Sequence, residues 1–198
     1  MVLFVIFTST AGGESRIVFL GDSLTAGYGL DPEQAYPALL ESRLSDEGIE
    51  ATVVNAGVSG DTSAGGLRRV NWVLSQPTDV LLVALGGNDG LRGQPTEALA
   101  ENLTAIIETA RSKYPDIQIL LAGMQMPASM GKQYQQNFAA VYPTVAEENG
   151  VTLIPFLLKD VAGAPALNQS DQIHPNAKGQ EIIAETVWPY LQQAVRAE

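Results

Sequence analysis

The sequence contains one histidine, His174, and an aspartate, Asp171, lies three residues before it. A turn between the two places the carboxylate beside the imidazole Nδ1 and leaves Nε2 free to act as a base. Ser23 lies near the start of the chain, in the segment GDSLT of residues 21–25. A serine hydroxyl becomes a nucleophile when a neighbouring base takes its proton and a third group orients that base. We therefore interpret Ser23, His174 and Asp171 as candidates for nucleophile, base and orienting carboxylate.

Acyl transfer also requires hydrogen-bond donors that face the oxyanion of the tetrahedral intermediate. Three candidates are the backbone N–H of Ser23, the backbone N–H of Gly60 and the side-chain amide of Asn88. Taken one at a time, these residues have simpler interpretations. Ser23 and Asp171 are typical helix caps, Gly60 and Asn88 are typical turn residues, and a lone histidine is commonly a hydrogen-bonded structural residue. The functional interpretation depends on a fold that brings the five residues together.

The elements that must position these residues alternate along the chain between short apolar runs and helical patterns. The apolar runs predict strands at residues 17–20, 51–55, 80–85, 117–121 and 151–156. Helical spacing predicts helices within residues 36–44, 62–76, 99–110, 134–148 and 182–191. This alternation is typical of a three-layer α/β/α domain, because parallel strands need crossover connections. We expect a flavodoxin-like, five-stranded parallel sheet with strand order 2-1-3-4-5.

The candidate residues all lie in polar segments that such a sheet gathers at one edge. In open parallel sheets, ligands bind beyond the carboxyl ends of the strands. The segments 21–25, 55–61 and 86–89 follow the first three predicted strands, and the segment 171–175 precedes the last helix. Their meeting at one edge would supply nucleophile, base, orienting group and oxyanion donors in one place. We favour this joint interpretation over a set of unrelated caps and turns.

The composition excludes several classes of site and partner. The absence of cysteine removes thiol nucleophiles and thiolate-held metals, and a single histidine removes zinc sites built from several histidines. The formal net charge of −11, from 11 basic and 22 acidic side chains, disfavours a nucleic-acid partner. A chain of 198 residues is long enough to form one domain with its own core. We expect chemistry that needs neither a metal nor an organic cofactor.

The first thirteen residues differ from the rest of the chain. Residues 2–7 read VLFVIF and are followed by the small residues STA at positions 9–11. This pattern is similar to the end of a secretory signal, although a basic start and a full apolar run of about 7 to 15 residues are missing. We predict a tail of residues 1–13, one domain of residues 14–198, and a periplasmic or secreted protein. The alternative is a cytoplasmic protein whose ordered tail packs on the domain or on a neighbouring subunit.

No other stretch approaches the length and apolarity of a membrane span, so no stable membrane insertion is expected. We expect a monomer. The alternative is an oligomer that forms through the apolar tail.

Four sequence blocks carry a resemblance to a known family. The blocks are GDSLTAGYGL at 21–30, NAGVSGDT at 55–62, GGND at 86–89 and DQIH at 171–174. In this order they resemble the four blocks of the SGNH, or GDSL-type, hydrolases, and they look most like the bacterial thioesterase I, lysophospholipase L1 and arylesterase group. The resemblance covers the chain from about residue 16 to its end.

The roles that the resemblance implies are the same as those inferred above from the residue types and their spacing. It implies a Ser23 nucleophile, a His174 base that later acts as an acid, an Asp171 orienting carboxylate, and an oxyanion hole formed by Ser23, Gly60 and Asn88. Asp22 and Asp89 also match positions in these blocks. We expect them to be structural and to hold the loops by hydrogen bonds to nearby backbone N–H groups.

The leading functional hypothesis is a serine esterase that acts on small-molecule or lipid esters through an acyl-enzyme on Ser23. Short to medium acyl chains are expected, with thioesters and lysophospholipids as further candidates, and neutral substrates are favoured because the chain is acidic. Met124, Met126, Pro127 and Leu158 are candidates for contact with the acyl chain, because methionine adapts to varied apolar shapes. The alternative is that these side chains complete the core. Competing functions are a carbohydrate acetylesterase and a non-catalytic small-ligand-binding module.

Overall fold

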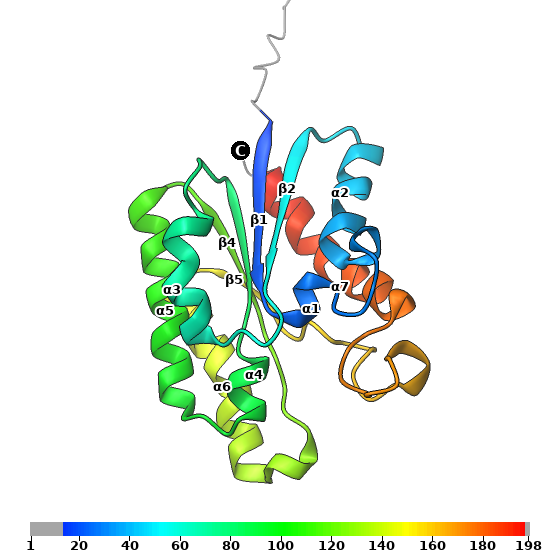
Figure 1. The fold of residues 1–198 in the computed structure, drawn as a ribbon. Helices are drawn as coiled ribbons and strands as arrows, with labels where there is room; N and C mark the ends of the chain where they lie inside the picture. The colour runs from blue at the N-terminus through cyan, green and yellow to red at the C-terminus, as the bar shows by residue number, and fades with distance from the viewer. Residues whose placement is uncertain (1–13, 197–198) are drawn as a thin grey trace, which may run out of the picture.

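Five parallel strands form the central layer, in the order β2-β1-β3-β4-β5. The computed structural model describes residues 14–196, with helices on both faces of this sheet (Figure 1). The strands are β1 (Ser15–Gly21), β2 (Ala51–Gly57), β3 (Val80–Ala84), β4 (Gln118–Ala122) and β5 (Thr152–Ile154). The predicted fold class and strand order are confirmed. The predicted tail, residues 1–13, lies outside the described residues.

The helices divide between the two faces as the crossovers require. The helices α2 (Tyr36–Asp46) and α7 (Ala177–Val195) cover one face, and α3 (Ser63–Val73), α5 (Thr96–Lys113) and α6 (Lys132–Asn149) cover the other (Figure 1). The chain moves outward from β1 to β2 and then back across to β3, β4 and β5. Because such crossovers are right-handed, the reversal of direction moves the helices to the opposite face.

The core lies on both sides of the two central strands. Residues 17–20 of β1 and 80–83 of β3 are fully buried, and both strands are almost entirely apolar, as expected for strands with helices on each face. The edge strand β2 is only partly buried along its length. Among residues 14–196, no helix combines the length and the apolarity that a membrane span requires.

Two elements end at least two residues earlier in the structure than the sequence pattern predicts. The strand predicted for 151–156 ends at Ile154, because Pro155 has no N–H to donate to β4. The helix predicted for 62–76 ends at Val73, shortly before Pro77. Conversely, the sequence analysis missed two short helices, α1 (Ser23–Ala26) and α4 (Gly87–Leu91).

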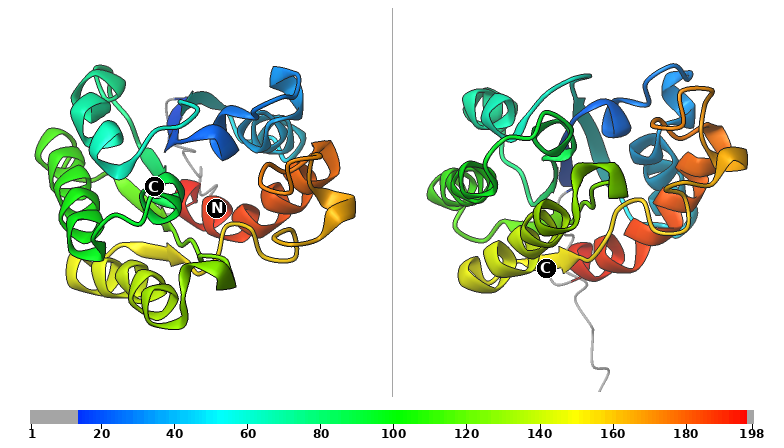
Figure 2. Two further views of the ribbon diagram at one scale, coloured as in Figure 1. Left: turned by 60° about the horizontal axis from the view of Figure 1, so that its bottom comes forward. Right: turned by 90° about the horizontal axis from the view of Figure 1, so that it is seen from below.

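Both missed helices lie at the carboxyl edge of the sheet, which is seen end-on in the right panel of Figure 2. The long segment between β5 and α7 runs along this edge and contains the short helix η3 (Pro165–Leu167). It passes beside the segment that follows α1, and the side chain of Gln169 bonds there to the carbonyl of Tyr28. The first and last parts of the domain therefore meet where the candidate residues lie.

Candidate active site

Ser23 is the first residue of α1, directly beyond the carboxyl end of β1. Asp22 caps this helix, because its Oδ1 accepts the N–H of Leu24 at 3.0 Å. N–H groups in the first turn of a helix have no intrahelical acceptor, so the N–H of Ser23 remains available to an external one. The local structure thus presents both the hydroxyl and the N–H of Ser23 at the sheet edge.

His174 connects Ser23 with Asp171. Its Nε2 lies 3.0 Å from the Oγ of Ser23, and its Nδ1 lies 2.7 Å from Oδ2 of Asp171. The other carboxylate oxygen of Asp171 accepts the backbone N–H groups of Ile173, at 2.9 Å, and His174, at 3.0 Å. The turn is therefore closed by the same carboxylate that contacts the imidazole. The structure brings the three candidate residues into one continuous row.

The environment of Asp171 keeps its carboxylate charged. Hydrogen bonds from the backbone N–H and the ring of His174, and then from the N–H of Ile173, lower the pKa of Asp171 to about 2. The side chain is 38% exposed, so solvent also reaches it. An ionised carboxylate at Nδ1 favours the tautomer with a proton on Nδ1, which leaves the lone pair of Nε2 facing Ser23.

Gly60 and Asn88 lie in the two neighbouring loops. Gly60 has a φ of 79°, a conformation that favours glycine, and its carbonyl accepts a hydrogen bond from Arg92 at 2.9 Å. Among the described residues, the N–H groups of Ser23 and Gly60 donate no hydrogen bond. Asn88 is the second residue of α4, and its Nδ2 lies 3.3 Å from Oδ2 of Asp22. These three donors are free, wholly or in part, to bind a developing negative charge.

Asp22 and Asp89 hold the loops together, as expected. Asp22 binds Leu24 and Asn88 while being almost completely buried, and that burial raises its pKa to about 6. Asp89, in α4, accepts the backbone N–H of Ser63 at 2.9 Å and its hydroxyl at 2.5 Å. The two aspartates therefore link α4 to the starts of α1 and α3.

The four candidate acyl-contact residues have different environments. Met124 and Met126 are buried, Leu158 is half-buried, and Pro127 is exposed before the short helix η2 (Ala128–Met130). An added Cβ at Gly87 would lie 3.3 Å from Oδ2 of Asp22 and 3.6 Å from the Met124 methyl group, whereas the space beside Gly90 is filled by the Met126 thioether. Both methionines thus support α4, the helix that contains Asn88. Their contact with an acyl chain stays a prediction.

Three residues next to the site were missed by the sequence analysis. The ring of Tyr28 lies 4.5 Å from the ring of His174, centroid to centroid, at an interplanar angle of 38°. Gln169 bonds to the backbone on both sides of the site. Arg69 of α3 binds the last carbonyl of β1, at Gly21, and a carbonyl near the end of β2. Tyr28 lies within the GDSLTAGYGL block, which was the available signal, whereas Gln169 and Arg69 lie outside all four blocks.

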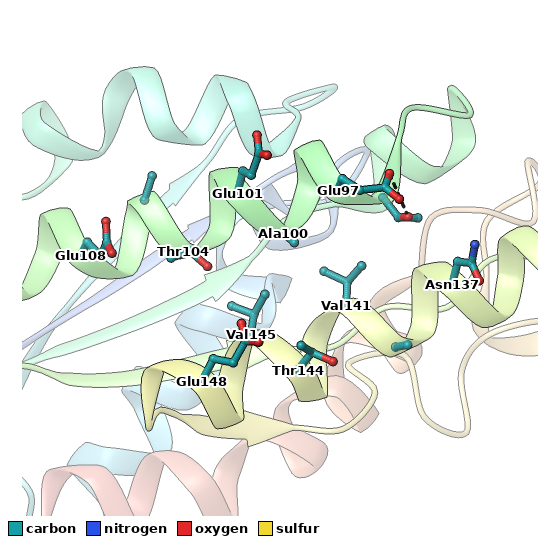
Figure 3. Close-up of a pocket in the computed structure, with 13 residues that line it drawn as sticks. Glu97, Ala100, Glu101, Thr104, Glu108, Asn137, Val141, Thr144, Val145 and Glu148 are labelled. Atoms are coloured by element: carbon teal, nitrogen blue, oxygen red, sulfur yellow. Dashed lines mark hydrogen bonds between the residues drawn. The ribbon is translucent and has the colours of Figure 1, made fainter.

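A separate groove of about 540 Å³ lies between α5 and α6 (Figure 3). Its labelled acidic residues come from both helices and are Glu97, Glu101, Glu108 and Glu148. None of the candidate active-site residues lines it. Within residues 14–196, no group of three or more histidine or carboxylate side chains is arranged to hold a metal ion.

Comparison with known proteins identifies the family. The sequence profile described as "GDSL-like Lipase/Acylhydrolase family" matches residues 19–182. The chain belongs to this family. The predicted resemblance to the SGNH, or GDSL-type, hydrolases is therefore confirmed, and this GDSL-family member is a carboxylic ester hydrolase by class.

Individual members of the GDSL family match along nearly the whole chain. Esterase TesA of Pseudomonas aeruginosa is 43% identical over 94% of this chain and 92% of its own length. Thioesterase 1/protease 1/lysophospholipase L1 of Escherichia coli strain K12 is 37% identical over 98% of this chain and 91% of its own length. The structure of the psychrotrophic esterase EstA from Pseudoalteromonas sp. matches with a TM-score of 0.86 and 32% identity, over 92% of this chain and 99% of that one. These similarities favour neither the acetylesterase nor the binding-module alternative.

Proposed function

We propose that this chain hydrolyses carboxylic esters of short to medium acyl chain length through an acyl-enzyme on Ser23. The observation that carries the proposal is the row of contacts from Ser23 Oγ to His174 Nε2, at 3.0 Å, and from His174 Nδ1 to Asp171, at 2.7 Å. Both distances are hydrogen-bond distances, so a proton can pass from serine to imidazole without rearrangement.

Acylation begins when Nε2 of His174 takes the hydroxyl proton and Oγ of Ser23 attacks the ester carbonyl carbon. The carbonyl π electrons move to oxygen, and the resulting oxyanion accepts hydrogen bonds from the N–H groups of Ser23 and Gly60 and from Nδ2 of Asn88. The bond to the alcohol oxygen then breaks, and His174 gives its proton to the leaving alcohol. Ser23 is left as an ester of the substrate's acid.

Deacylation repeats the sequence with water as the nucleophile. His174 takes a proton from water, the hydroxide attacks the acyl carbon, and the same three donors bind the oxyanion. The bond from carbon to Ser23 Oγ breaks, and the proton on His174 returns to Oγ. The acid is released and the enzyme is restored without a change of oxidation state.

The surface around the site supports an apolar substrate. The exposed large apolar side chains include Tyr28, Val58, Leu91 and Ile173. Trp72 is also exposed but lies near the end of α3, outside the four sequence blocks. Tyr28, Val58 and Ile173 lie within these blocks, and Leu91 lies two residues after the block 86–89. Their grouping at a single edge of the sheet gives the acyl chain or the alcohol an apolar surface beside Ser23.

We propose Met124, Met126, Pro127 and Leu158 as further acyl contacts. The two methionines support α4 and have flexible side chains that can adjust to an acyl chain at the site. Thioesters and lysophospholipids are additional candidate substrates, supported by the name of the Escherichia coli relative. The net charge of −11 favours neutral esters over strongly anionic substrates.

Hydrolysis of p-nitrophenyl esters from acetate to palmitate, by the wild type and Ser23→Ala in parallel, tests the proposal. We expect turnover that depends on Ser23 and a chain-length profile that extends beyond acetate. A sharp optimum at acetate would favour the acetylesterase alternative. Wild-type turnover that survives in Ser23→Ala, with contaminating hydrolase excluded, would refute the acyl-enzyme on Ser23.

Covalent labelling gives a second test that does not depend on the choice of ester. The esterase EstA structure is described as inhibited by monoethylphosphonate. We expect Oγ of Ser23 to attack the phosphorus of a reactive alkyl phosphonate and to displace its leaving group into solvent. Mass spectrometry of the Ser23 peptide detects the phosphonyl ester that remains on Ser23. Labelling at another residue would contradict the assigned nucleophile.

We also propose that the protein acts in the periplasm or outside the cell as a monomer. The apolar residues 2–7 and the small residues that follow them support export. Cell fractionation of the native protein tests the location, and sedimentation of the purified protein tests the oligomeric state. Recovery in the cytoplasm, or a dimer that requires the tail, would favour the alternatives.

A further inference from the structure

One amide nitrogen joins the two segments that hold Ser23 and His174. Nε2 of Gln169 lies 2.7 Å from the carbonyl oxygen of Tyr28 and 3.0 Å from that of Pro175. Tyr28 follows α1, and its N–H bonds to the carbonyl of Ser23 at 3.0 Å. Pro175 directly follows His174. Gln169 therefore connects the backbone near the nucleophile to the backbone near the base.

The chemistry of the amide group makes this connection specific. Two carbonyl oxygens cannot donate to each other, whereas a side-chain NH₂ group carries two hydrogens and satisfies both. The opposite orientation of the amide would place three oxygens together without a proton. The bridge therefore fixes both the orientation of the Gln169 amide and the separation of the two carbonyls.

The surroundings of Gln169 restrict its side chain further. Its backbone N–H donates to the carbonyl of His174 at 2.7 Å, and its own carbonyl accepts the N–H of Gln172 at 2.9 Å. Its Oε1 lies over Gly29, where an added Cβ would come within 2.6 Å of it. Gly29, at φ 76°, thus provides the space that the amide fills. The ring of Tyr28 packs on the imidazole of His174 at the same point.

The turn that holds the imidazole does not itself need this bridge. Asp171 closes the turn through the N–H groups of Ile173 and His174 and through Nδ1, all within four residues. By contrast, the contact between His174 and Ser23 spans 151 residues of sequence. A local turn can stay intact while its position relative to Ser23 changes.

We propose that Gln169 is a positioning residue that sets the distance between His174 Nε2 and Ser23 Oγ by bridging the carbonyls of Tyr28 and Pro175. This inference rests on the proposed function of Ser23 and His174. The side-chain hydrogen bonds of Gln169 go to backbone carbonyls and not to Ser23 Oγ or the imidazole. Gln169 acts by keeping the turn of residues 171–174 at a constant position relative to α1, which contains Ser23. Misplacement of a catalytic group by about 1 Å can lower a rate about 100-fold.

Gln169→Met tests the proposal, because methionine has a similar length and shape but no donor. We expect kcat to fall about 10- to 100-fold, with KM changed less than about twofold, because substrate contacts are untouched. The rate constant for phosphonate labelling of Ser23 should fall by a similar factor. Gln169→Asn retains the NH₂ group on a shorter side chain that cannot reach both carbonyls, and it should show the same loss.

Gln192→Met is the matched control. The amide nitrogen of Gln192, in α7, bonds at 2.9 Å to Glu47, which directly follows α2, so this residue also connects distant segments. We expect its kcat and labelling rate to stay within about twofold of the wild type. Thermal unfolding of each variant shows whether it is folded, and Gln169→Asn replaces Gln169→Met in every comparison if the latter does not fold.

Nuclear magnetic resonance separates positioning from general damage to the turn. His174 is the only histidine, so the untagged protein has a single set of imidazole signals. We expect the downfield Nδ1 proton, bonded to Asp171, to persist in Gln169→Met while the labelling rate falls. Loss of that proton in a folded variant would overturn the proposal, because Gln169 would then be holding the turn itself.

Two outcomes distinguish this proposal from the proposed function. An active, Ser23-dependent wild type together with unchanged kcat in a folded Gln169→Met would overturn the positioning role alone. A wild type with neither Ser23-dependent turnover nor Ser23 labelling would overturn the proposed function, and with it this inference.

Discussion

Asp171 performs two structural tasks with its two carboxylate oxygens. One oxygen closes the turn by accepting two backbone N–H groups, and the other accepts the imidazole Nδ1–H of His174. The hydrogen bonds that close the turn also lower the pKa of Asp171 to about 2, so the carboxylate is charged at neutral pH. The position of the imidazole and its tautomer therefore depend on the same side chain.

His174→Ala and Asp171→Asn should differ in severity. Removing the base should lower kcat by a factor on the order of 10⁴ or more, because no other histidine exists to replace it. Asp171→Asn should cost less, because the partly exposed position lets water reach Nδ1. Steady-state kinetics with one p-nitrophenyl ester measures both. Unchanged turnover in His174→Ala would contradict the mechanism, and equal losses would contradict only the ranking.

Asp22 should make the stability of the protein depend on pH. Burial raises its pKa from 3.8 to about 6, so folding favours its protonated form. The stabilisation is complete below pH 4 and is lost as the pH rises through about 6, an effect of roughly 3 kcal/mol for two pKa units.

Comparison with Asp22→Asn isolates this effect. We expect the free energy of unfolding of Asp22→Asn, relative to the wild type, to increase between pH 4 and pH 8. Any constant cost of the altered contact with Asn88 cancels in this difference. Urea unfolding at the two pH values measures it, and a difference that is constant or falls would show that folding does not raise the pKa of Asp22.

At the scale of elements, a side chain from the middle of α3 binds the ends of the two strands that lead into the site. Arg69 donates to the carbonyls of Gly21, at 2.9 Å, and Ala56, at 2.6 Å, and pairs with Asp61 at 2.8 Å. These acceptors lie beside the segments that contain Ser23 and Gly60. One guanidinium group therefore connects the backbone beside Ser23 with the backbone beside Gly60.

Arg69→Met should weaken both the fold and the site. It removes one donor from each of two carbonyls and the ion-pair partner of the mostly buried Asp61, which should cost roughly 3 kcal/mol of unfolding free energy. We also expect a lower kcat, because the loops lose a shared anchor. Arg68→Met is the control, since Arg68 is exposed on the same helix. Equal effects of the two variants on urea unfolding and on kcat would contradict this role.

For the whole molecule, the described residues contain a complete sheet, both helical layers and all the candidate site residues. We propose that residues 14–198 form one domain that functions without residues 1–13. A variant that begins at Glu14 should unfold within about 2 °C of the full chain, because a change of 1 kcal/mol shifts the midpoint of a domain of this size by about 2–4 °C. Its ester hydrolysis should be unchanged. A large loss of either would show that the tail is part of the domain.

The sequence predicted the layers and the candidate site residues, and it made 2-1-3-4-5 the expected strand order, which the structure then confirmed. Apolar runs of strand length alternate with helical patterns, and parallel strands with right-handed crossovers allow few arrangements of five such units. Ser23, Gly60 and Asn88 directly follow strands or lie in the loops after them. Their place at the carboxyl edge therefore followed from the chain order once the strands were recognised.

The contacts that hold these residues in place could not be predicted from the sequence. The contacts of Gln169 with Tyr28 and of Arg69 with Gly21 join residues 141 and 48 positions apart. Helical and strand periodicities report which face of an element is apolar, not which distant carbonyl a polar side chain reaches. The short helices α1 and α4 are single turns, too short to show a helical period in the sequence. Their aspartates also bond to distant residues, Asp22 to Asn88 and Asp89 to Ser63.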